Sequence, residues 1–218
     1  MKTNHIRTLF AAGVAVASLL GCAAPASAPD DGVALQQMLK ASFRDKGIAT
    51  VDRLRQDETD AACSKAQGQP LPDATRQAIE AANMKTVKFP ADGRFIGDWK
   101  AGEALAQNGR GMTWSDPSAK PSSNGGNCYN CHQITKAEIS YGTLGPSLYQ
   151  YGKLRGVKDP ASAEAKAIVE YTWGKLWNAK AYSACSGMPR FGHQGLLDET
   201  QLKNLMALLL DPKSPVNQ

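Results

Sequence analysis

Two cysteines and a histidine form the most reactive cluster in this sequence. Cys128, Cys131 and His132 lie in the stretch NCYNCHQ, with two residues between the cysteines and the histidine directly after them. Thiols and an imidazole at this spacing have three established uses. They can form a redox-active dithiol, contribute to a zinc site, or attach a haem covalently through the C-x-x-C-H signature.

The first two uses fit the surrounding sequence poorly. A thioredoxin-like dithiol should open a helix directly after a buried strand, and the preceding residues KPSSNGGN do not read as a strand. A Cys₃His zinc set would need Cys185 and His193. Their spacing is loose, and exported proteins more often pair their cysteines. Both uses stay as alternatives to haem.

Haem c is the interpretation that we favour. Its two vinyl groups would bind Cys128 and Cys131, and His132 would reach the iron from the same face. A second axial ligand is expected from the irregular stretch SGMPRFG, where Met188 precedes Pro189. Methionine sulfur is a soft ligand that raises the reduction potential. His193, and more weakly Met112, are the alternative ligands.

Further residues are candidates for supporting the haem. The other ring N–H of a proximal histidine needs an acceptor, and the Pro146 carbonyl is our candidate. Arg155 and Arg190 are candidates for pairing with the haem propionates, although each also reads as an ordinary surface arginine. Tyr149, Tyr151 and Trp173 would pack on the porphyrin or in the core.

The N-terminus reads as an export signal. It has a basic start with Lys2 and Arg7, followed by an apolar stretch over residues 8–20. That stretch is too short to span a bilayer, which takes about 20 apolar residues. Leu-Leu-Gly-Cys at its end looks like a lipobox, so we expect a lipoprotein-type signal peptide over residues 1–21 and lipidation of Cys22. The alternative is plain export with Cys22 discarded.

The remaining cysteines suggest a disulfide. The chain has 5 cysteines. Cys22 belongs to the signal and two others to the C-x-x-C-H motif, which leaves Cys63 and Cys185. Because an exported protein folds in an oxidising compartment, we expect these two to form a disulfide. Two buried free cysteines are the alternative.

Composition limits the classes of protein. The chain has 218 residues, of which 42% are hydrophobic and 21% charged, and a net charge of +5. This suits one domain with an extension, or two small domains. The charge is too mild to indicate nucleic-acid binding.

The hydrophobic pattern predicts a mainly α protein, because no segment shows sustained strand alternation. Helices are expected over residues 32–46, 57–66, 74–83, 98–108 and 161–177 and after Asp198, with Asp73 as an N-cap and Asp198 with Gln201 as a capping box. A helix before the haem motif and one at the end of the chain are the two that cross in class I cytochromes c. We therefore expect a class I cytochrome c-like domain over residues 95–218. A tether and an α-helical N-terminal extension would occupy residues 22–94.

The segment from about residue 95 to the end resembles the SoxX family, the monohaem subunits of the SoxAX cytochrome complex of thiosulfate oxidation. The resemblance rests on GNCYNCH, GTLGPSL, YGKLRG, GMPRFG and the final LLLDPKSPVN. It implies His132 and Met188 as axial ligands, a SoxA-like partner subunit, and the SoxYZ carrier as a second partner.

The resemblance also implies a role. The complex couples thiosulfate oxidatively to a cysteine of SoxYZ, and this subunit would relay the electrons to a downstream cytochrome in the periplasm. It would not itself be the catalytic subunit. The lipobox departs from a soluble periplasmic protein and suggests a membrane anchor. A free-standing electron shuttle and a haem-based sensor are the alternative functions.

Overall fold

The computed structural model describes residues 31–218. The predicted signal peptide and Cys22 therefore lie outside the described residues. The chain divides into two units, one up to Phe43 and one from Arg44 to Gln218. The described part of the first unit holds helix α1 (Asp31–Ser42), which ends four residues before the predicted limit at residue 46. Its apolar side chains Val33, Leu35 and Met38 are exposed.

The second unit is built from helices joined by irregular segments. Its α-helices are α2 (Glu58–Lys65), α3 (Asp73–Met84), α4 (Trp99–Gln107), α5 (Tyr151–Leu154), α6 (Lys166–Trp177) and α7 (Glu199–Leu210). Over residues 31–218 no β-strand forms, and the prediction of a mainly α fold is confirmed. None of the helices described is long and apolar enough to cross a bilayer. The domain boundary predicted at residue 94 falls inside this second unit.

One of the two predicted N-caps is found. Asp198 and Gln201 form the capping box of α7, and the Asp98 side chain accepts from the Lys100 N–H at the start of α4. The prediction for Asp73 is wrong, because Pro72 holds the N-cap of α3. Asp73 instead occupies the first turn, where the helix dipole favours a carboxylate.

Helix α6 begins later than the sequence pattern predicts. The expected start was residue 161, and the observed start is Lys166. The Asp159 carboxylate accepts from the Ala161 N–H at 2.8 Å, and the Asp159 carbonyl accepts from the Ser162 N–H. Local bonds of this kind compete with helix formation, so these residues form turns ahead of the helix.

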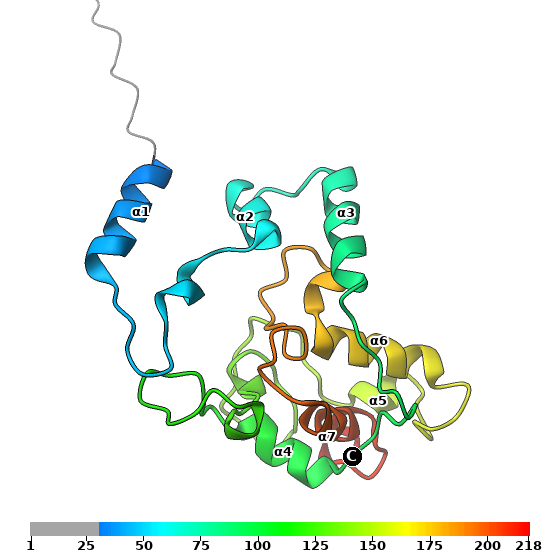
Figure 1. The fold of residues 1–218 in the computed structure, drawn as a ribbon. Coiled ribbons are helices and arrows are strands. Elements are labelled where there is room, and N and C mark those ends of the chain that lie inside the picture. Colours follow the sequence, from blue (N-terminus) through cyan, green and yellow to red (C-terminus); the bar gives the residue numbers. More distant parts are fainter. Residues whose placement is uncertain (1–30) are drawn as a thin grey trace, which may run out of the picture. The chain divides into compact units, whose positions relative to one another are not determined.

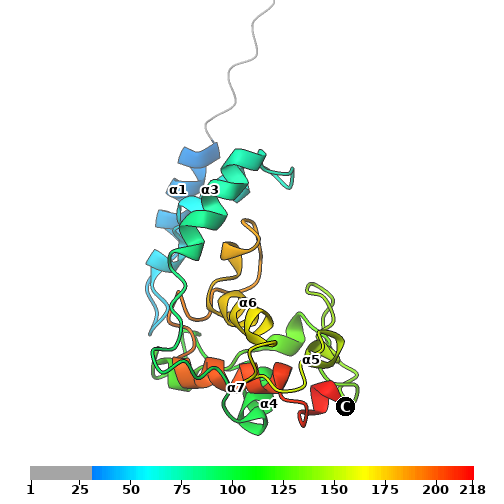
Figure 2. The same ribbon diagram turned by 90° about the vertical axis from the view of Figure 1, so that its right-hand side faces the viewer.

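Helices α4 and α7 pass close to each other, as both ribbon views show (Figures 1 and 2). Two glycines, one before α4 and one within it, allow this approach. A Cβ atom on Gly102 would lie 2.1 Å from the Asn204 carbonyl oxygen, and one on Gly97 would lie 2.3 Å from the Asn204 side-chain oxygen. The crossing therefore depends on the lack of side chains at these two positions.

Replacing Gly102 with alanine tests the crossing. Helix propensity alone would make this change stabilising by about 1 kcal/mol. We expect the opposite sign, a loss of about 1–3 kcal/mol in the free energy of unfolding, because the new methyl group collides with backbone. Urea unfolding of the variant measures the sign, and a more stable protein would contradict the crossing described here.

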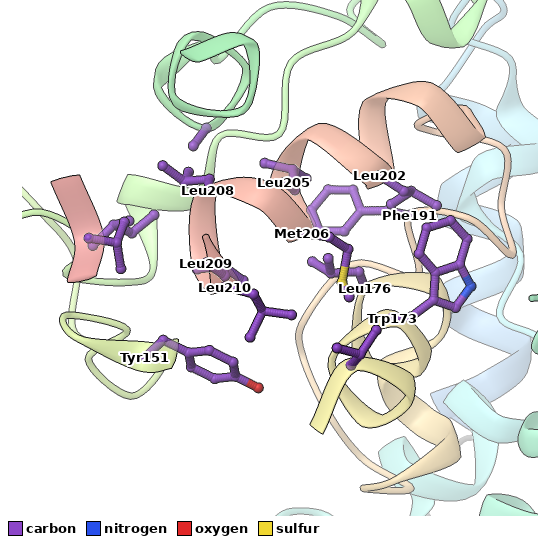
Figure 3. Close-up of a cluster of buried hydrophobic side chains, with 14 of the residues drawn as sticks. Tyr151, Trp173, Leu176, Phe191, Leu202, Leu205, Met206, Leu208, Leu209 and Leu210 are labelled. Atoms are coloured by element: carbon purple, nitrogen blue, oxygen red, sulfur yellow. The ribbon is translucent and has the colours of Figure 1, made fainter. Parts of the chain in front are cut away.

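The core is centred on α7. Met206 extends from this helix toward Leu176 of α6, and Trp173 and Phe191 lie nearby (Figure 3). The side chains of Trp173, Leu202, Met206 and Leu210 are fully buried. Because α7 is apolar on more than one side, it packs against α4, α5 and α6 together.

The segment before α4 is joined to this core by buried polar contacts. The indole N–H of Trp173 donates to the Lys88 carbonyl at 2.8 Å, and that of Trp177 to the Thr86 carbonyl at 2.9 Å. The buried Asn178 amide donates to the Asn83 side-chain oxygen at 2.9 Å. Since buried polar groups are costly when unpaired, these bonds join residues 83–88 of the predicted extension to the core of the second unit.

Candidate functional site

The C-x-x-C-H motif forms a single helical turn. Cys128–Asn130 is a 3₁₀ helix, and the Cys128 carbonyl accepts from the N–H groups of both Cys131 and His132, at 3.1 and 2.9 Å. Asn127 starts the turn in the left-handed region with φ of 50°, which asparagine tolerates better than most residues. Positions i, i+3 and i+4 of a helical turn share one face. The spacing of the motif is therefore one that would bring both thiols and the imidazole to the same side of the turn.

Backbone hydrogen bonds hold this turn from both sides. Before the motif, the N–H groups of Gly126 and Asn127 donate to carbonyls at the end of α4. After it, the N–H groups of Gly142, Gly145 and Leu148 donate to the carbonyls of Tyr129, Cys131 and Gln133, at 2.7–2.8 Å. The Gly-rich segment following the motif thus wraps around the turn and fixes it.

The His132 ring is oriented by two neighbours. Its Nδ1 lies 2.7 Å from the Pro146 carbonyl oxygen. Because a carbonyl only accepts, Nδ1 carries the proton, and in the neutral tautomer with this proton the lone pair is on Nε2. Gly145 packs directly against the ring, where an added Cβ would lie 2.1 Å from Cε1. The structure thus forms the hydrogen bond predicted for Pro146 and leaves Nε2 suited to bind a metal.

The two motif thiols are not joined in a disulfide. Burial, followed by the charges of Cys131 and Glu103, raises the pKa of the Cys128 thiol to about 12. A redox-active dithiol needs the reverse, a lowered pKa that supplies thiolate near neutral pH. The motif also follows an irregular segment rather than a strand. These observations weigh against the dithiol alternative.

Tyr129, between the cysteines, anchors the turn to α4. Its hydroxyl donates to the Glu103 carboxylate at 2.8 Å and lies 3.1 Å from the Thr135 hydroxyl. Burial raises the pKa of Tyr129 to about 12, with the Glu103 carboxylate adding to the rise and the Thr135 contact opposing it. No local sequence pattern predicts this network, because Glu103 lies 26 residues from Tyr129.

Met188 lies in the irregular segment between Ala181 and α7. It is half-buried, and its side chain packs against the same hydrophobic core as Cys128 does. Its backbone N–H donates to the Ser186 hydroxyl at 3.2 Å. The predicted role of Met188 as an axial ligand stays a prediction.

The predicted disulfide between Cys63 and Cys185 is confirmed. The two residues bond between α2 and the segment before Met188, with their Cα atoms 5.5 Å apart. Cys185 is therefore not available to the zinc set considered above. Within residues 31–218 no group of three or more His, Cys, Asp or Glu side chains is arranged to hold a metal ion.

The two arginines proposed for haem propionates have other partners. The exposed Arg155 guanidinium lies 3.7 Å from the centre of the Tyr151 ring and donates to the Tyr151 carbonyl. The Arg190 side chain is only 7% exposed and pairs with Asp57 at 2.5 Å and Asp60 at 3.4 Å. The buried Arg190 guanidinium is thus paired with two partly exposed carboxylates, whereas the role of Arg155 stays a prediction.

The two alternative axial ligands also lie in irregular segments, and the His193 N–H donates to the Trp177 carbonyl at 3.0 Å. His193 is exposed; partial burial, and then the nearby Arg190 charge, lower the pKa of its ring. Met112 has a φ of 64°, and its carbonyl accepts from Arg53 at 2.6 Å. Neither contact orients the side chain itself.

The ion pair on Arg190 makes stability depend on pH. Burial opposes ionisation of Asp57, but the Asp60 N–H and Arg190 outweigh it, so the pKa of Asp57 lies below its usual value of 3.8. A carboxylate whose pKa is lowered by folding stabilises the fold at pH values above its pKa in the unfolded chain. This contribution disappears as the pH falls through its pKa in the folded protein. We therefore expect Asp57→Asn to lower the melting temperature at pH 7. The difference from the parent should shrink toward zero at pH 2, and a difference independent of pH would contradict this assignment.

The C-terminus folds back onto the segment after the motif. The Asn217 side-chain oxygen accepts from the N–H groups of Gly152 and Lys153, at 2.9 and 3.1 Å, and its amide donates to the Leu209 carbonyl. The Gln150 N–H donates to the Val216 carbonyl at 2.7 Å. Two of the stretches behind the SoxX resemblance, YGKLRG and DPKSPVN, are thus in direct contact.

Comparison with known proteins gives one informative relative. No family model matches the chain. Over 168 residues it is 36% identical to an uncharacterized lipoprotein of Aquifex aeolicus (strain VF5). The matched region covers 75% of this chain and 73% of that protein. That relative carries no assigned activity.

Proposed function

The chain belongs to the same family as the Aquifex aeolicus lipoprotein, and from this premise we propose that it too is exported and lipid-anchored. Cys22, at the end of the lipobox, is the residue that would carry the acyl chains. Each buried CH₂ group contributes about 0.8 kcal/mol to membrane binding, so two or more chains give a stable anchor. The second unit would then stand outside the cytoplasm, where the Cys63–Cys185 disulfide persists.

We further propose that this unit is a monohaem c-type cytochrome. The observation that carries the proposal is the His132 ring, whose Nδ1 is 2.7 Å from the Pro146 carbonyl and whose Nε2 is left for a metal. Cys128 and Cys131 on the same face would hold the haem covalently. Their thiols are free, and the spacing of the motif would bring all three side chains together.

A bound haem supplies reversible one-electron chemistry. The protein's part is to hold it and to set its potential. His132 and Met188 would occupy both axial positions, and a sulfur ligand favours the reduced state. If His132 and Met188 both held the haem iron, the haem would be suited to electron transfer rather than to binding substrate.

The proposed setting is a SoxAX-type complex. In it the chain would receive electrons from a SoxA-like subunit as thiosulfate is coupled to the SoxYZ carrier, and would pass them to a downstream cytochrome. The support is the sequence resemblance, together with the packing of Asn217 onto Gly152 and Lys153, which gives a structural reason for two of the shared stretches.

Coexpression tests this setting. The chain is produced with a SoxA-type subunit and the SoxYZ carrier, and reduction of its haem is followed after thiosulfate is added. We expect copurification with the SoxA-type subunit and reduction that requires both partners. If the haem is present but the chain neither associates nor is reduced, the free-standing shuttle is the better assignment.

A further inference from the structure

Helix α2 makes an unusual contribution to the second unit, because none of its residues is buried. Its sequence ETDAACSK has no apolar side suited to the core. Helices in proteins are usually stabilised by packing an apolar face. The contacts that hold α2 are instead a hydrogen bond from the Asn83 amide of α3 to the Thr59 hydroxyl, a disulfide and a set of ion pairs. The disulfide and the ion pairs of Arg190 reach the segment that carries Met188.

The first contact lies just before Met188. The disulfide joins Cys63 of α2 to Cys185, three positions ahead of the methionine, across 122 residues of sequence. Helix α3 also contacts this part of the chain, since the Glu80 carboxylate accepts from the Ala184 N–H at 3.3 Å. The chain entering the Met188 segment is therefore fixed covalently.

The second contact lies just after Met188. Arg190 pairs with Asp57 and Asp60, at 2.5 and 3.4 Å, and its side chain is 7% exposed. The Asp57 carboxylate also accepts from the Asp60 N–H as the N-cap of α2. Asp57 thus both caps α2 and holds Arg190, where the chain leaves the Met188 segment. Lys180, in the 3₁₀ helix Ala179–Ala181, also pairs with Asp60.

Between these contacts the backbone around Met188 has few restraints of its own. Gly187 has open space around it, and glycine loses more conformational freedom on ordering than other residues do. Pro189 restricts a single φ angle. A loop of this kind would leave Met188 mobile unless its two ends were held.

We propose that α2 is a positioning element for Met188, acting through the Cys63–Cys185 disulfide on one side and the Asp57–Arg190 ion pair on the other. The proposal rests on the proposed function, in which Met188 is the second axial ligand. The N-terminal extension thereby gains a role. It supplies no haem ligand but keeps Met188, a weak sulfur ligand, in place. Loss of either contact would lower the fraction of molecules with Met188 bound.

Imidazole is the probe, since it competes with Met188 for the haem in the oxidised protein. We compare the parent holoprotein with Asp57→Asn. Asparagine caps a helix as well as aspartate does, so this variant keeps α2 but removes the charge opposite Arg190. The matched control is Asp98→Asn, the same change at the N-cap of α4. A second variant, Cys63→Ser with Cys185→Ser, removes the other contact.

We expect imidazole affinity to rise about tenfold or more in Asp57→Asn and in the cysteine variant, because apparent affinity scales with the fraction of molecules open to the competitor. The far-red absorption band of methionine-bound ferric haem should weaken in parallel. The Asp98→Asn control should match the parent. Equal imidazole affinities in parent and Asp57→Asn, or an equal rise in the control, would overturn the proposal.

Hydrogen exchange on the parent chain keeps the test independent of the variants and of the haem. Reducing the disulfide should speed exchange at the backbone N–H groups of residues 185–188 and 190 by about tenfold or more, if opening of that segment becomes correspondingly easier, while α7 keeps its protection. Unchanged exchange would overturn the proposal. If no haem is attached to the parent, the proposed function fails, and this measurement still decides whether α2 holds the segment.

Discussion

Removing the Cys63–Cys185 disulfide is expected to lower the free energy of unfolding by about 4–5 kcal/mol, because the bridge closes a loop of more than 100 residues in the unfolded chain. The sequence separation of the two cysteines is 122. The measurement is urea unfolding of the Cys63→Ser, Cys185→Ser variant against the parent, with one probe for the helices and one for the tryptophans. Coincident transitions are needed for a two-state comparison.

The control for this prediction is Ser64→Ala, on the same helix but outside the disulfide. It should unfold within about 0.5 kcal/mol of the parent, as exposed substitutions usually do. A loss below about 1 kcal/mol in the cysteine variant would contradict the prediction, since it would mean that the bridge adds little to the constraints of the unfolded chain.

Replacing Gly145 with alanine is expected to disrupt the His132 site. The new Cβ would lie 2.1 Å from Cε1 of the imidazole and 2.5 Å from Nδ1, so the ring must leave its place against the Pro146 carbonyl. We expect a loss of about 1–3 kcal/mol in stability from overpacking. Nitrogen chemical shifts of the His132 ring would report whether the Nδ1–H bond to Pro146 is lost.

The matched control is Gly187→Ala, where an added Cβ meets nothing within 4 Å. This variant should keep the His132 nitrogen shifts of the parent. If Gly145→Ala also keeps them, the ring is not held by the contact with Gly145 and the geometry described for the site is wrong.

Local patterns predicted much of the fold. The capping box of Asp198 and Gln201 depends on two residues three positions apart, and the start of α4 follows directly after Asp98. The Cys63–Cys185 disulfide was also predictable, because removing the cysteines with other roles left a single pair. In each case the signal lies in residue type and spacing, without knowledge of the packing.

Contacts between distant segments could not be predicted in the same way. Arg190 pairs with Asp60 across 130 residues, and before the structure it was a candidate for binding haem propionates. The role of Gly145 beside His132 is likewise a matter of close approach, which depends on how the Gly-rich segment wraps around the turn. The start of α6 was misplaced because the turn at Asp159 outcompetes a helical pattern.

The central claim is that Cys128, Cys131 and His132 hold a haem covalently. The most direct test is the intact mass and the reduced absorption spectrum of the chain, exported from a host that matures c-type cytochromes. We expect one covalently attached haem that survives denaturation and is absent from the Cys128→Ser, Cys131→Ser variant. A parent chain that carries no haem, or a double variant that carries as much as the parent, would contradict it.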